Sequence, residues 1–243
     1  MTLPVVLLHF FGSSHREWET VTALFVVDRP VLAFDLPGFG DAADCGAADV
    51  DAMTDYVDTR IVEAGWSDCV VVGHSMSGKI AAVLAARQPA YLRGLVLVTA
   101  SPPSPEPMTE YARRKLMAFD HSRDAAADYI DGITEKLLPD PLREVAISDA
   151  MRASPEAWQA WVSQGSREDR SADVGRLALP TLVVVGRSDP SLGEDVQRRQ
   201  VMPHFIDARV VVMRGGHALP LENPADLHRE IDAFITALES HFE

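Results

Sequence analysis

The sequence predicts an α/β fold with a mostly parallel sheet, flanking helices and an all-helical insertion. Short runs rich in β-branched residues recur along the chain, and such runs suit strands that are buried on both faces. Helical patterns separate these runs, and this alternation is typical of parallel strands joined by right-handed crossovers. Between residues 101 and 175 we find prolines and helical patterns but no convincing strand, which indicates the insertion.

Composition excludes several classes of function. The chain has 243 residues, with 22 basic and 36 acidic side chains and a formal net charge of −14, so it repels phosphate backbones and nucleic acid is not an expected partner. No apolar run has the length of a signal peptide or membrane span, so we expect a cytoplasmic protein without a membrane partner, as a monomer or homodimer. The two cysteines, Cys45 and Cys69, lack metal or redox spacing, and we expect neither a metal nor a cofactor.

The first two strands are expected near the N-terminus. The run Val-Val-Leu-Leu at 5–8 is apolar throughout, and apolar residues with helical spacing follow over 15–25. The next apolar run, at 30–34, leads into Asp-Leu-Pro-Gly-Phe-Gly at 35–40, a cluster typical of a turn. We expect Asp35 in this turn to be structural.

A serine lies at a sharp turn between a strand and a helix. After a helix expected at 50–64, Val70 to Val72 predict a buried strand, and residues 80–86 continue as an apolar helix. The sequence Gly-His-Ser-Met-Ser-Gly at 73–78 joins them. A strand that turns directly into a helix crowds the backbone, so small residues are needed on both sides of the turn residue Ser75. This pattern predicts a nucleophile elbow, and an ordinary glycine-rich turn is the alternative.

Apart from the insertion, the remaining elements continue the alternation of strands and helices. A strand is expected at 92–99, directly before the proline-rich start of the insertion. Beyond the insertion we expect strands at 181–185 and 208–213, a helix at 195–202, and a closing amphipathic helix at 224–238 with Asn223 as its N-cap.

Candidate catalytic residues follow the carboxyl ends of separate predicted strands. Ligands of open parallel sheets bind at these ends, so we expect Ser75, Asp189 and His217 to lie close together. A serine hydroxyl needs a base, and His217 on a Gly-Gly loop is the best candidate. Asp189 would orient that histidine, although it could instead form an Asp-Pro turn. Glu106 is a spare candidate for the acid, and His74 is expected to pack beside the elbow.

Acyl transfer also requires donors for an oxyanion. The backbone amide of Met76 begins the helix after the serine, and the loop after the first strand offers the amide of Phe11. Phe10, Phe11 and Met76 are therefore candidate substrate-binding residues. An aromatic pair is more often part of a core than of a site, so that role for the two phenylalanine side chains stays open.

Five blocks in this order resemble the α/β-hydrolase family: Leu-Leu-His-Phe-Phe-Gly at 7–12, the turn at 35–40, the elbow at 73–78, Gly-Arg-Ser-Asp at 186–189 and Gly-His at 216–217. The resemblance covers the first strand to residue 100, and residue 179 to the end. It implies a serine hydrolase with the triad Ser75, Asp189 and His217. It also implies a core domain of residues 1–100 and 176–243 beneath a helical cap at 101–175.

The chain departs from the family pattern at three points. Phe10 stands where a glycine is usual after the histidine of the oxyanion loop, and Ser77 replaces the second glycine of the elbow. The first two strands of the family are absent, which leaves a sheet of about six strands. The strand at 31–34 should then lie at an edge, with Pro30 as a guard against pairing.

The expected function is hydrolysis of a small-molecule ester, or of a related acyl bond such as a lactone, through an acyl-enzyme and without a cofactor. The same triad would serve a C–C bond hydrolase or a cofactor-free haloperoxidase or perhydrolase, which are the alternatives. A further alternative, from a different class of function, is a non-catalytic ligand-binding protein on this fold.

Overall fold

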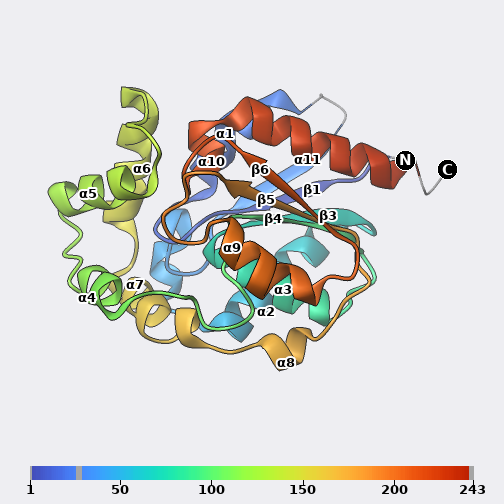
Figure 1. Cartoon of the computed structure of the whole chain (residues 1–243), viewed down its shortest axis with the longest axis horizontal. Coiled ribbons are helices and arrows are strands. Elements are labelled where there is room, and N and C mark those ends of the chain that lie inside the picture. Colours follow the sequence, from blue (N-terminus) through green and yellow to red (C-terminus); the bar gives the residue numbers. More distant parts are fainter. Residues whose placement is uncertain (1, 26–28, 241–243) are drawn as a thin grey trace.

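A computed structural model describes residues 2–25 and 29–240 of the chain. Six parallel strands form one sheet at its centre, in the order β2-β1-β3-β4-β5-β6 (Figure 1). The strands are β1 (Val5–Leu8), β2 (Val31–Phe34), β3 (Cys69–His74), β4 (Leu92–Val98), β5 (Thr181–Gly186) and β6 (Ala208–Met213). The predicted sheet of about six strands is confirmed, and β2 lies at its edge as expected.

Helices cover both faces of the sheet because alternate residues of each strand are buried in different clusters. On β3, Val71 packs with helices α2 (Val50–Glu63) and α3 (Met76–Ala86). Its neighbours Val70 and Val72 pack on the opposite face with helix α11 (Pro224–Glu239). Figure 1 shows α1 (Glu19–Leu24) and α10 (Leu219–Glu222) on the same side as α11. Both faces are therefore apolar, as the continuous valine runs predicted.

The segment between β4 and β5 contains helices and no strand; all of its residues are described. Most of this helical segment lies to one side of the sheet in Figure 1, over the carboxyl ends of the strands, whereas its last helix lies beside α3. They are α4 (Glu110–Met117), α5 (Arg123–Ile133), α6 (Asp140–Arg152), α7 (Pro155–Ser163) and α8 (Ser171–Val174). The division into a core and a cap at residues 101 and 175 stays a prediction.

The segment expected as a helix at 195–202 is helical, but the type of helix changes along it: a short α9 (Glu194–Val196) is followed by a π-helix at Gln197–Val201 and a 3-10 turn at Met202–His204. The expected N-cap of the last helix differs from the structure. Asn223 occupies the N-cap position of α11, but its side chain does not accept from the helix. Its amide donates instead to the Arg214 carbonyl at 3.3 Å and to Asp226 at 3.1 Å. Pro224 at the first helical position has no N–H to offer, which reduces the need for a cap.

No helix within residues 2–25 and 29–240 is both long and apolar enough to cross a lipid bilayer.

Candidate active site

The turn between β3 and α3 holds Ser75 in a strained backbone conformation. Its φ of 53° and ψ of −115° lie in a region that residues with a side chain rarely adopt. The neighbouring glycines make this turn possible. A Cβ on Gly73 would lie 2.6 Å from the Ser77 carbonyl oxygen, and one on Gly78 would lie 2.4 Å from Cβ of Ala100. The predicted requirement for small residues on both sides of the serine is therefore met.

Ser77 does more than fit in the place of a glycine. Its hydroxyl lies 2.9 Å from the carbonyl oxygens of Leu8 and His74, and it accepts the His74 amide hydrogen at 2.8 Å. These contacts join the elbow to the end of β1. The serine therefore supplies hydrogen bonds to buried backbone groups that a glycine could not supply.

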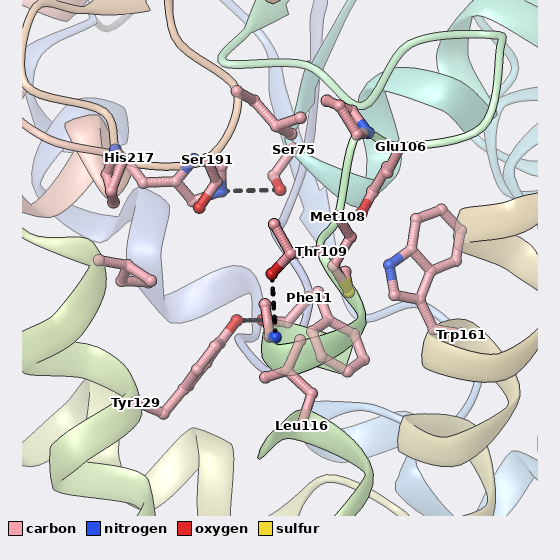
Figure 2. A pocket seen from close by; sticks show the side chains of 15 residues that line it. Phe11, Ser75, Glu106, Met108, Thr109, Leu116, Tyr129, Trp161, Ser191 and His217 are labelled. Carbon is pink, nitrogen blue, oxygen red and sulfur yellow. Dashed lines mark hydrogen bonds between the residues drawn. The ribbon is translucent and has the colours of Figure 1, made fainter. Parts of the chain in front are cut away.

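The structure brings Ser75, His217 and Asp189 together in one line, although they lie far apart in the sequence. Nε2 of His217 is 2.8 Å from the Ser75 hydroxyl oxygen (Figure 2). Nδ1 of the same ring is 2.8 Å from Oδ2 of Asp189. The other Asp189 oxygen accepts the backbone amides of Ser191 at 2.8 Å and Leu192 at 3.0 Å. Asp189 can therefore form the Asp-Pro turn with one carboxylate oxygen and orient His217 with the other, so the two predicted roles are compatible.

Opposing effects set the charges of the histidine and the aspartate. Burial disfavours the protonated imidazole, but the Asp189 carboxylate, with smaller contributions from Glu106 and Glu17, outweighs this effect and raises the pKa of His217 above its usual value. Burial likewise disfavours the ionised Asp189, but His217 and the two backbone amides lower the pKa of this carboxyl below its usual value. The pair therefore favours an imidazolium next to a carboxylate, the state that a general base reaches after it takes a proton.

A glutamate that the sequence analysis missed holds the histidine loop. Glu222 accepts the backbone amides of Gly216 at 3.0 Å and Ala218 at 3.1 Å, on either side of His217. It also accepts the amide of Glu135 at 2.7 Å, at the end of the α5 segment. Nothing in the sequence distinguishes this residue from the exposed acids of the chain, because its role depends on how three segments meet.

A second buried pair lies behind the first. His74 packs beside the elbow as expected, and its Nε2 donates to the carbonyl oxygen of His217 at 2.8 Å. Its Nδ1 lies 2.8 Å from the Glu17 carboxylate. Because a carbonyl oxygen can only accept, Nε2 of His74 carries a hydrogen, and the other ring nitrogen faces the carboxylate. Thr99 also donates to the His217 carbonyl, at 3.2 Å, so the backbone of the candidate base is fixed from two sides.

A cavity of about 240 Å³ opens beside Ser75 and His217. Apolar side chains from the helical segment, from the loop after β1 and from the loop after β5 form most of its wall; they include Phe11, Met108, Leu116, Ile133, Trp161 and Leu192 (Figure 2). Tyr129 and Glu106 add polar groups. Sequence reasoning identified Phe11 but none of the residues from the helical segment as cavity residues.

The loop after β1 is held by the helices above it. Tyr129 on α5 donates its hydroxyl to the Phe11 carbonyl oxygen at 2.8 Å (Figure 2), and the Phe11 ring lies 4.2 Å from that of Trp158 on α7. A Cβ on Gly12 would lie 2.7 Å from the Trp158 ring, so this loop also needs a glycine. Side chains of α5 and α7 therefore pack on the loop that carries the candidate oxyanion donor.

Two predicted substrate-binding side chains do not line the cavity. Phe10 is buried in a cluster with Ile130 and Leu221, and its ring lies 5.1 Å from that of His74. The prediction that Phe10 forms a wall of the pocket is corrected accordingly, because the helical segment covers its ring. The backbone φ at Phe10 is not positive, so the glycine that is usual there is not required. The Met76 side chain is also fully buried, in the core under the elbow.

Glu106 and Asp35 do not belong to the triad. Glu106 lines the cavity, but Asp189 and not Glu106 bonds to His217. Asp35 accepts the amides of His15 and Asp41 at 2.5 Å each, and its Oδ1 lies 2.9 Å from Nδ1 of His15. Its ligand atoms lie near those of His15 and Asp41 in a group that could surround a cation. Asp35 already accepts three N–H groups, so the turn structure accounts for this carboxylate.

Comparisons with known proteins agree with this architecture. Residues 5–230 match a family model described as "Alpha/beta hydrolase family". The chain is 29% identical over 242 residues to pimeloyl-[acyl-carrier protein] methyl ester esterase of Neisseria meningitidis, covering 88% of this chain and 86% of that protein.

Solved structures are similar in fold at lower sequence identity. The bromoperoxidase of Bacillus anthracis superimposes with a TM-score of 0.88 at 20% identity, covering 97% of this chain and 92% of that one. An esterase from Exiguobacterium antarcticum gives 0.86 at 19% identity, with 96% and 92% covered. At this identity the likeness shows the fold alone.

Proposed function

The chain belongs to the alpha/beta hydrolase family and is an α/β-hydrolase enzyme, and we propose that it cleaves a small carboxylic ester through a serine acyl-enzyme. The observation that carries this proposal is the line of hydrogen-bond distances from Asp189 through His217 to Ser75, with the serine oxygen facing a cavity. A serine hydroxyl in such a line has a base for its proton and room for a substrate.

The proposed reaction has two halves. Oγ of Ser75 attacks the carbonyl carbon of the ester while Nε2 of His217 takes the hydroxyl proton. The backbone amides of Met76 and Phe11 hold the resulting oxyanion, and collapse expels the alcohol, to which His217 returns the proton. Water then attacks the acyl-enzyme with His217 as base, which releases the acid and restores Ser75.

The cavity supports a small, largely apolar substrate. Its volume of about 240 Å³ lies just below the usual range of roughly 300–1,000 Å³ for small-molecule pockets. The Neisseria relative is named for the methyl ester of a pimeloyl-[acyl-carrier protein], so its name supports a small alcohol group and says nothing for a short acyl group, which the cavity volume alone supports here. We therefore propose a short ester, or a lactone of similar size, as the substrate.

Replacing Ser75 with alanine tests the mechanism. We expect turnover of short activated esters to fall by at least about 10³-fold because the nucleophile is lost, and a fluorophosphonate probe to add mass at Ser75 only in the wild type. Ser163→Ala, at the end of α7, is the matched control and should behave as wild type.

Unchanged turnover in Ser75→Ala would overturn the proposed mechanism. A folded wild type that neither reacts with the probe nor hydrolyses any ester would favour a binding protein. A panel that includes lactones, diketones and peracid formation separates ester cleavage from the other reactions that this triad could carry out.

A further inference from the structure

The cavity contains a carboxylate for which the proposed mechanism has no use. Glu106 lies in the loop between β4 and α4 and lines the same cavity as Ser75 and His217 (Figure 2). Its backbone amide donates to the Ser166 carbonyl oxygen at 2.8 Å, which fixes this part of the loop. The carboxylate is thus held beside the reacting groups rather than on a free loop.

No cation of the described residues forms an ion pair with Glu106. Glu106 itself is half-buried, and several acids with buried carboxylates have partners: Glu17 pairs with His74, Asp149 with Arg16, and Asp189 with His217. The positive charges that act on Glu106 bond elsewhere, and among them His217 bonds to Asp189. Lys79 donates to the carbonyl oxygens of Gly165 at 3.2 Å and Glu168 at 2.9 Å, and Arg113 donates to Val162 and Ser166.

The surroundings of the Glu106 carboxylate indicate that it lacks a further hydrogen-bond donor. Burial raises the pKa of this carboxyl, and the Ser101 hydroxyl and the charges of Lys79, His217 and Arg113 only partly offset that effect. A carboxylate in an apolar site is costly unless hydrogen bonds compensate it. A ligand that brings an O–H or N–H group would supply this compensation.

The other groups that line the cavity make an anionic ligand unfavourable. No lysine or arginine of the described residues lines this cavity, so a second carboxylate would meet, beside Glu106, only the His217 imidazole, which already bonds to Asp189. Because Glu106 and Ser75 share a cavity of about 240 Å³, the donor must belong to the same small molecule as the ester.

We propose that Glu106 is the specificity-determining residue of this cavity and that it accepts a hydrogen bond from a hydroxyl or ammonium group of the substrate. The preferred substrate class is then a small ester that carries such a donor, and esters that carry a carboxylate are rejected. This inference rests on the proposed ester hydrolysis at Ser75.

Matched esters test the inference by kinetics. Wild type should hydrolyse methyl β-hydroxybutyrate and β-alanine methyl ester with kcat/KM about tenfold or more above that for methyl butyrate, because hydrogen bonds to charged groups have this magnitude. Glu106→Leu should lose both preferences. Glu106→Gln keeps an acceptor, so it should retain the hydroxyl preference, lose the ammonium preference, and raise kcat/KM for monomethyl succinate about tenfold.

Glu110→Gln is the control, since this exposed acid on α4 lies near Glu106 in sequence but outside the cavity lining. It should leave all the ratios unchanged. The amide variant of Glu106 preserves the shape of the side chain, so it keeps the test valid if Glu106→Leu does not fold.

A binding measurement separates this inference from the proposed function. Trp161 lines the cavity, so its fluorescence can report binding of the intact esters to Ser75→Ala. Glu106-dependent preference in binding, without turnover by the wild type, would support the inference and contradict ester hydrolysis. Ser75-dependent turnover whose substrate ratios do not change in Glu106→Leu or Glu106→Gln would overturn the inference and leave ester hydrolysis standing.

Discussion

At the scale of single residues, the protonation of His217 should control activity. The proposed base must be neutral to accept the Ser75 proton, and its pKa is raised because Asp189 outweighs the effect of burial. Activity should therefore rise with pH through an apparent pKa above the usual value of 6.5 for histidine.

The variant Asp189→Asn tests this assignment. Loss of the carboxylate removes the group that favours the imidazolium, so the acid limb of the kcat/KM profile should move to lower pH, while kcat falls by about 10³- to 10⁴-fold. Profiles measured from pH 4 to 9 would show both effects. An acid limb that stays in place in the variant would mean that another group titrates.

Single residues also show which parts of the site could be predicted from the sequence and which could not. Ser75, Asp189 and His217 could be predicted because each follows a strand, and strand ends converge by topology alone. Glu17 and Glu222 could not be predicted, since each acquires its role from segments that meet only in the folded chain. Phe10 was misjudged because its neighbours come from the helical segment, whose placement the sequence does not reveal.

At the scale of elements, the elbow was predictable and its attachment to the helical segment was not. Steric crowding at a strand-to-helix turn is a local rule, and Gly73 and Gly78 obey it. The same helix α3 contains Lys79, which is fully buried and donates to carbonyl oxygens of residues 165 and 168. A helical pattern gives no sign that this lysine points away from solvent, so the contact between the two elements emerged only from the structure.

This buried lysine should make stability depend on pH. Burial lowers the pKa of Lys79 from 10.5 to about 8, so between these pH values the unfolded chain binds a proton that the folded chain does not. The free energy of unfolding of wild type should therefore rise by up to about 3 kcal/mol from pH 8 to 10.5, relative to a variant without this group.

Urea unfolding of wild type and Lys79→Met at pH 7.5 and 10 measures the difference. Lys115→Met, which removes an exposed lysine of α4, is the control and should leave the pH dependence as in wild type. If Lys79→Met and wild type change in parallel over this range, the lysine is either solvated or already neutral at pH 7.5.

At the scale of the whole molecule, the net charge of −14 should act on charged substrates before they reach the cavity. Salt screens the long-range field, so the three esters should respond differently as NaCl is raised from about 20 to 500 mM. The kcat/KM for β-alanine methyl ester should fall, that for monomethyl succinate should rise, and that for methyl butyrate should stay constant.

The variant Glu106→Gln separates this long-range effect from an effect inside the cavity. It removes one acidic charge among 36, so it should shift kcat/KM at every salt concentration but keep the slope of kcat/KM against salt for each ester. Slopes that vanish in this variant would place the whole effect in the cavity, and a slope for the neutral ester would show that salt acts on the fold instead.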